Sequence, residues 1–353
     1  MNDAVPLPND PFLGNSQPVG NDTQAPILDM FVGPCGFQPA ASLPTPLGIS
    51  LPDMGMSMVD AGTLTIDDNL FTAFNSYAVS NKRDPLAWEI GITERSRIKF
   101  VIHQLKTYPT LLVKHGKTPF IHSQASYPLI SPQLQDAISA SALYLSKNEQ
   151  NEAIVWDVIS AKVAALMEVQ ASRSLAEHLT CLQALVIYQI IRLFDGDIRA
   201  RAEAEKSEDR LVDWTDRLSL RIGASTPLGP VLSTSWENWV FVEAVSRTII
   251  ISRMVQAMFM VVKQGFCTMV EAVTEMSFTG QKALWHAPTA VHWQQACKQR
   301  KRFYVNRMDF RELMEKGDLS DVDQLGVLML VCYKGVDGVN EWIVAKGGKD
   351  LLE

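Results

Sequence analysis

Residues 175–194 read LAEHLTCLQALVIYQIIRLF and indicate the fold class more directly than any other segment of this chain. Apolar side chains cover nearly every face of a helix drawn through this sequence. A helix that is apolar all round belongs in the interior of a protein. The Asp195-Gly196 pair that follows is typical of a helix end. We therefore expect a central buried helix over these residues.

The segments on either side of this helix show the three-and-four spacing of amphipathic helices. Residues 202–222 have one charged side and one apolar side. Residues 152–170 show the same pattern. The buried face predicted for them consists of Ile154, Val155, Val158, Ile159, Val163, Leu166 and Met167.

Three helix starts are predicted where a capping residue precedes the first helical turn. These are Asp84 and Ser131, each before a proline, and Ser235, which opens an apolar run to residue 263. No segment shows the alternation of a strand or the turn chemistry of a hairpin. The predicted fold is all-α, an irregular array of many helices. The shorter helices are expected at 267–276, 289–304, 308–316, 320–333 and 338–346.

Charge and proline are unevenly distributed along the 353 residues. Residues 1–81 contain eight Asp and no Lys, Arg or Glu, so their charge is −8. The net charge of the whole chain is −7, so the remaining residues sum to about +1. Residues 1–84 also hold ten of the 18 prolines. Such a segment buries too little apolar surface to offset its ordering entropy. We expect a disordered acidic arm over 1–84 and a helical domain over 85–353.

One stretch of the arm mixes acidic and apolar residues. Acidic-hydrophobic segments of this kind resemble disordered activation segments, whose apolar groups enter a partner's groove. A linker with chance aromatics fits equally well. The candidate activation residues are Asp67, Asp68, Leu70, Phe71 and Phe74.

The cysteines and the apolar runs point to a protein that is neither metal-bound nor membrane-spanning. No CxxC pair is present, so a zinc or redox site is not expected, and Cys181, Cys267 and Cys332 are predicted to be buried free thiols. The most apolar run, 239–262, is broken by charges such as Glu243 and Arg247, which a membrane span excludes.

Several ordered pieces of the chain together resemble the regulatory domain of fungal zinc-binuclear-cluster transcription factors. The resemblance covers roughly residues 85–350 and implies an all-helical regulatory domain. The pieces are Leu105-Lys-Thr-Tyr-Pro, Thr118-Pro-Phe-Ile-His122, Leu134-Gln-Asp-Ala137 with Tyr144-Leu145, Asn151-Glu152, Trp236-Glu-Asn-Trp239 with Glu243 and Arg247-Thr248, and Asp323-Gln-Leu-Gly through Glu341-Trp342.

Two departures from the family pattern bear on function. Ser246-Arg247 stands where the family has paired arginines. The six-cysteine head that reads DNA has no counterpart in 1–81, which holds only Cys35 and no basic residue. The resemblance therefore implies transcriptional regulation, while direct and sequence-specific DNA binding by this chain is not expected.

Enzymatic and cofactor motifs are not found. Gly116-Lys117-Thr118 has Leu111 where a phosphate-binding loop needs its first glycine. The histidines lack metal-ligand spacing, and His178 with Cys181 supplies only two groups on one helix face. We expect no catalytic residue, no metal and no cofactor.

Two further features have competing interpretations. Lys298, Arg300, Lys301 and Arg302 form a dense basic run that suits a nuclear import signal. A solvated helix face, followed by Phe303 and Tyr304 turning inward, is the favoured alternative. Trp236 and Trp239 are expected to pack in the core, with a small-molecule pocket as the less favoured role.

The resulting hypothesis is a nuclear regulator of transcription for a metabolic, secondary-metabolite gene set. Its expected partners are other transcription regulators or coactivators, with DNA contacted only indirectly, no membrane, and a homo- or hetero-dimer left open. Two alternative hypotheses are a helical interaction scaffold and a helical enzyme of secondary metabolism. A cytoplasmic location would favour the scaffold.

Overall fold

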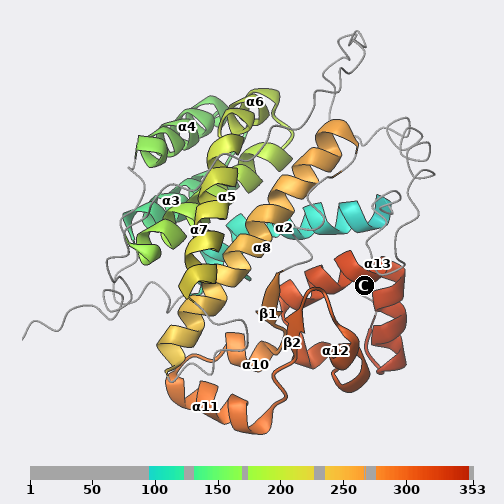
Figure 1. Ribbon diagram of the computed structural model, residues 1–353. Coiled ribbons are helices and arrows are strands. Elements are labelled where there is room, and N and C mark those ends of the chain that lie inside the picture. Colours follow the sequence, from blue (N-terminus) through green and yellow to red (C-terminus); the bar gives the residue numbers. More distant parts are fainter. Residues whose placement is uncertain are drawn as a thin grey trace, which may run out of the picture. The chain divides into compact units, whose positions relative to one another are not determined.

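The structure is a computed structural model that describes residues 95–122, 131–168, 174–225, 235–265, 267 and 276–349. Most of these residues are helical, so the predicted all-α fold is confirmed (Figure 1). The proposed arm over 1–84, the helix start at Asp84 and nearly all of the helix expected at 267–276 lie outside the described residues. The candidate activation residues 67–74 lie outside them too.

The central buried helix is present and ends where predicted. Helix α5, Leu175–Phe194, is buried along almost its whole length, and Asp195 caps its C-terminal end. It packs against α2 (Arg95–His115), α3 (Pro132–Leu145), α7 (Glu208–Ser225) and α8 (Trp236–Gln264). Because neighbours surround it, its few polar side chains, such as Gln183 and Arg192, are buried with hydrogen-bond partners.

Helix α8 is the second core helix and starts at the predicted cap. The Ser235 side chain accepts a hydrogen bond from the Asn238 N–H, and Gly265 ends the helix at φ 84°. Among the described helices, α8 is long and apolar enough to cross a membrane by length and composition. Most of that apolar stretch is buried inside the protein, as in the core helix of a globular domain. Ser131 likewise caps α3, with Pro132 as its first residue.

Helix α4, Glu152–Glu168, buries a narrower face than the spacing predicted. Val155, Ile159, Val163 and Leu166 are buried, whereas Ile154 is 63% exposed. The expectation for Ile154 was wrong because α4 packs chiefly against α3 and α5, so only one stripe of its surface is covered.

The segment expected as one helix over 202–222 consists of two. Helix α6, Ile198–Lys206, ends at Ser207, and α7 begins at Glu208. The Ser207 hydroxyl accepts a hydrogen bond from the buried Arg192 guanidinium at 3.3 Å. This contact with α5 fixes the break, and a contact between distant residues leaves no periodic signal in the sequence.

The part of the chain that follows α8 packs against α2 and α8 (Figure 1). It contains the short helices α10 (Lys282–Trp285), α11 (Ala290–Gln299) and α12 (Arg311–Lys316), a 3-10 turn at Leu319–Asp321, and the long helix α13 (Gln324–Ala345). The two helices expected at 320–333 and 338–346 meet at a kink in α13, where Gly335 takes φ 81°. That positive φ favours glycine.

The prediction that no strand is present was wrong. Strands β1 (Ser277–Thr279) and β2 (Tyr304–Asn306) pair antiparallel, with Phe278 opposite Val305. The helices expected at 289–304 and 308–316 are correspondingly shorter, as α11 and α12. Three residues are too few to show alternation, and the two partners are separated by the whole of α10 and α11.

Candidate functional site

A single arginine of α8 joins four segments of the described chain. The Arg247 side chain is fully buried. Its Nε donates to Glu243 Oε1 at 2.8 Å, and its Nη2 donates to the Thr279 carbonyl at 2.8 Å. Its Nη1 donates to the Pro119 carbonyl at 3.1 Å and to the Asp323 carboxylate. We call Arg247, Glu243 and Asp323 the buried ionic centre.

The guanidinium remains charged in this interior. Burial by itself lowers the pKa of Arg247, but the negative charges of Asp323 and Glu243 outweigh burial and raise that pKa above its usual value. The Trp285 ring covers the guanidinium at 4.1 Å from its centroid. A buried cation is tolerated when carboxylates and carbonyls surround it in this way.

A second set of hydrogen bonds fixes the residues beside Pro119. The Phe120 carbonyl accepts from Gln183 Nε2 at 3.1 Å and from Thr248 Oγ1 at 3.4 Å. Thr118 Oγ1 accepts from the Ile121 N–H at 2.9 Å. The turn between α2 and α3 is therefore tied to both core helices, α5 and α8.

His122 completes this set on the α10 side. Its Nε2 lies 3.0 Å from the Trp285 carbonyl, and the two rings meet edge to face. The pKa of His122 is lowered to about 4, chiefly by burial and also by the positive charges of Arg247 and Lys117, against the raising effect of the Trp285 carbonyl. At neutral pH the imidazole is therefore uncharged.

Three of the sequence pieces that carry the family resemblance meet at the ionic centre. The Thr118–His122 piece, the Glu243 and Arg247-Thr248 piece and the Asp323 piece are far apart in sequence and meet here. Ser246, which replaces the first of the family's paired arginines, is half-buried. The neighbouring Arg247 is buried. Sequence reasoning identified the pattern but not the convergence.

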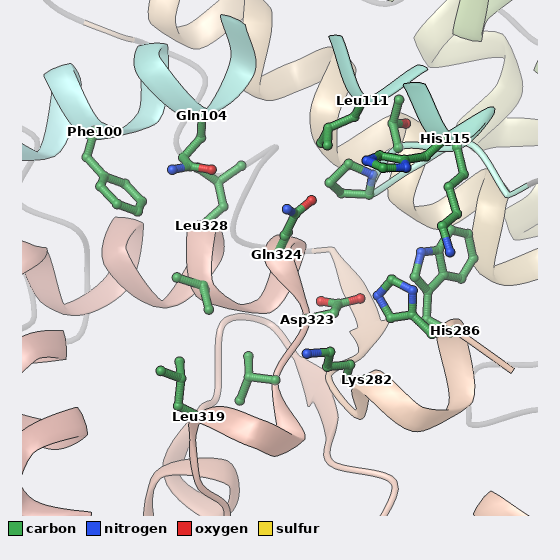
Figure 2. Close-up of a pocket in the computed structure, with 16 residues that line it drawn as sticks. Phe100, Gln104, Leu111, His115, Lys282, His286, Leu319, Asp323, Gln324 and Leu328 are labelled. Atoms are coloured by element: carbon green, nitrogen blue, oxygen red, sulfur yellow. The ribbon is translucent and has the colours of Figure 1, made fainter. Parts of the chain in front are cut away.

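A cavity of about 460 Å³ adjoins the ionic centre (Figure 2). Helix α2 contributes Phe100 and Gln104, and α13 contributes Gln324 and Leu328. The turn after α2 and the turn around α10 supply basic side chains, and Asp323 lies between these and α13. Nothing in the sequence pattern indicated this cavity, because its walls come from three separate parts of the chain.

The two tryptophans of α8 pack in a hydrophobic cluster, as predicted. Trp236 is buried with Leu284 and Trp293, and the Trp239 and Trp293 rings lie 5.7 Å apart. Neither Trp236 nor Trp239 lines the cavity, which instead receives Trp285.

The basic run is exposed and lies mostly outside a helix. Lys298 belongs to α11, whereas the backbone at Arg300 is extended (φ −119°, ψ 149°), and all four candidate import residues are exposed. Phe303 is buried as expected, but Tyr304 is exposed, so its predicted inward turn was wrong. The Lys301 side chain pairs with Glu312. An extended, exposed basic segment is the conformation that import receptors bind.

The described residues contain no group of three or more His, Cys, Asp or Glu side chains that could hold a metal ion. Cys181 and Cys332 are buried free thiols as predicted, whereas Cys267 is only half-buried, so its predicted burial was wrong. His178 is buried and lies 3.5 Å from the Arg221 guanidinium.

One curated protein matches the chain over most of its length. It is named Transcription factor gsfR2, from Penicillium aethiopicum, and is 35% identical over 264 residues, which are 71% of this chain. This chain is similar to a fungal transcription factor. The match covers 63% of the Penicillium relative, so the chain spans less than two thirds of its length.

The similarity is to a protein that is named as a transcription factor of a fungus. The Penicillium relative thus agrees with the resemblance seen in residues 85–350. No protein family profile matches the chain, and no solved structure matches it.

Proposed function

We propose that this chain is a nuclear, non-enzymatic regulator of transcription that controls a metabolic, secondary-metabolite gene set through protein partners. The observation that carries the proposal is the 35% identity to a protein named as a transcription factor. The helical body with its ionic centre supports it, because the sequence pieces that form that centre are the ones that resemble a regulatory domain. The partners would be other transcription regulators or coactivators.

Tethering tests the regulatory role. The chain fused to an unrelated DNA-binding domain should change the expression of a reporter that carries the matching DNA sites. A variant with Leu70, Phe71 and Phe74 replaced by Ala should lose activation, since apolar groups supply the contact with a coactivator. Replacing Leu7, Leu13 and Phe37 by Ala is the matched control elsewhere in the first 81 residues. A full-length fusion that leaves the reporter unchanged contradicts the regulatory role.

Localisation separates the regulator from the interaction scaffold. A fluorescent fusion should be nuclear, and replacement of Lys298, Arg300, Lys301 and Arg302 by Ala should move it to the cytoplasm. Replacing four dispersed exposed lysines is the charge-matched control and should not. A wild-type fusion that stays in the cytoplasm favours the scaffold. The control lysines are Lys99, Lys106, Lys114 and Lys334.

DNA contact is proposed to be indirect. Specific recognition needs side chains held on a rigid element at the base edges together with phosphate contacts. The acidic residues of 1–81 repel phosphate, and the basic run offers few contacts. Purified protein should show no preference among random DNA sequences at physiological salt and no bound zinc. A selected motif without a partner protein contradicts this proposal.

A further inference from the structure

The cavity beside the ionic centre has the size of a small-molecule site. Its volume is about 460 Å³, within the roughly 300–1,000 Å³ of typical ligand pockets. Helices α2 and α13 form opposite walls, as Figure 2 shows, with the turns before Pro119 and around α10 at one end. Its shape therefore depends on how α2 and α13 pack together.

One end of the cavity is apolar. Phe100 comes from α2, Leu319 from the 3-10 turn, and Val327 and Leu328 from α13, whereas Leu111 of α2 lies nearer His115 (Figure 2). The side-chain amides of Gln104 and Gln324 face the space between these helices, and neither has a hydrogen-bond partner among the described residues (Figure 2). This wall suits a hydrocarbon body that carries few polar groups.

The other end carries positive charge that is not paired with carboxylates of the described residues. His115, Lys117, Lys282 and His286 line it, and within the described part of the chain neither lysine has an ion pair. Asp323 is the one carboxylate in the lining, and it is already bound by the Arg247 guanidinium and the Gly326 N–H. An excess of cationic groups in a concave site attracts anions.

The lowered pKa of His286 agrees with an excess of positive charge around it. Desolvation lowers the pKa of His286 most, and the charges of Lys117, Arg247 and Lys282 lower it further, opposed by Asp323. The imidazole is therefore neutral at pH 7 and can donate or accept one hydrogen bond, while the lysines hold the charge.

We propose that this cavity binds a small amphipathic carboxylate, an aromatic or short aliphatic acid. Its hydrocarbon body lies against the apolar lining residues of α2 and α13, and its carboxylate meets Lys117 and Lys282. A bound ligand would contact α2, α10 and α13 together, next to the residues that hold these elements in place. Binding is a property of the purified chain, so it succeeds or fails independently of the transcriptional role.

Calorimetry on the full chain tests this site with benzoate, decanoate and 2-naphthoate, and with 2-naphthamide as the neutral isostere of the last. At least one acid should bind with one-to-one stoichiometry. For 2-naphthoate, the amide should bind roughly tenfold more weakly because a charge-assisted hydrogen bond is lost. Equal binding of acid and amide, or no binding of any acid at millimolar concentration, overturns the proposal.

Variants locate the binding in this cavity. Lys117→Gln and Lys282→Gln should each weaken the acid by roughly tenfold or less and the amide hardly at all. Lys114→Gln is the matched control, since Lys114 is exposed near the same turn and does not line the cavity. Val327→Trp should fill the apolar end and abolish binding of acid and amide alike. Unchanged affinity in the Lys117 and Lys282 variants places the ligand elsewhere and overturns the proposal.

Discussion

Helices α7 and α8 each carry an arginine four residues after a carboxylate, an aspartate on α7 and a glutamate on α8, and the surroundings of the two pairs are very different. Arg217 Nε lies 2.7 Å from Asp213 Oδ1, and Arg247 Nε lies 2.8 Å from Glu243 Oε1. The Arg217 and Asp213 side chains are 57% and 38% exposed, whereas those of Arg247 and Glu243 are 0% and 7% exposed. Local spacing therefore produces the same contact in both places.

The comparison shows that tertiary contacts decide what such a pair contributes. On α7 the two charges remain hydrated, and water competes with their attraction. On α8 the pair has lost its water, and the Pro119 carbonyl, the Thr279 carbonyl and the Asp323 carboxylate replace it. Removing one partner there leaves charges that nothing else can compensate.

The largest expected effect follows from this difference. Arg247→Met leaves Glu243 and Asp323 buried without their cation, and we expect the free energy of unfolding to fall by about 3–5 kcal/mol. Urea unfolding followed by circular dichroism measures the change, with Arg217→Met as the same substitution on α7. Equal losses in the two variants would remove the distinction between the pairs.

Acid should weaken the buried centre through His122. The pKa of this imidazole is about 4 in the folded protein and about 6.5 when unfolded, so only the unfolded chain takes up the proton between these values. Stability is full above pH 6.5 and is lost as pH falls toward 4, by about 3 kcal/mol from this ring. Unfolding at pH 7, 5.5 and 4 should show a shallower pH dependence in His122→Gln. His103→Gln, at an exposed position of α2, should retain the wild-type dependence.

A smaller loss of stability is expected when the charge of Asp323 is removed but the shape of its side chain is kept. Asp323 accepts the Gly326 N–H at 2.8 Å, which caps α13, and it also pairs with Arg247. Asn caps helices about as well as Asp. Asp323→Asn should therefore lose mainly the charged hydrogen bond, about 1–3 kcal/mol in urea unfolding. A loss as large as that of Arg247→Met would mean that the charge of Asp323 alone compensates most of the buried guanidinium charge.

The smallest effect is expected on the surface of α7. Arg217→Gln should lower the free energy of unfolding by about 0.3–0.5 kcal/mol at low salt. The difference from wild type should shrink further in 1 M NaCl, because salt screens exposed charges. A salt-independent loss above 1 kcal/mol would show that the α7 pair belongs to a larger network.

The candidate site was only partly readable in the sequence. Glu243, Arg247 and Thr248 were identified together because they resemble one motif of the family. Two of the partners of Arg247 are backbone carbonyls, at Pro119 and Thr279, and any residue type supplies a carbonyl. The cavity was not foreseen for a related reason, since its lysines come from separate turns and look like ordinary surface residues.

The sequence by itself determined the helices, because a helix is made by hydrogen bonds between residues four apart and by caps at its own ends. The apolar surface of α5 and the caps at Ser131 and Ser235 are local properties, and each prediction made from them was confirmed. Only the tertiary structure decided the break at Ser207, the β1–β2 pair and the buried ionic centre. In these the partners are far apart in the chain, so no local pattern records which residues will meet.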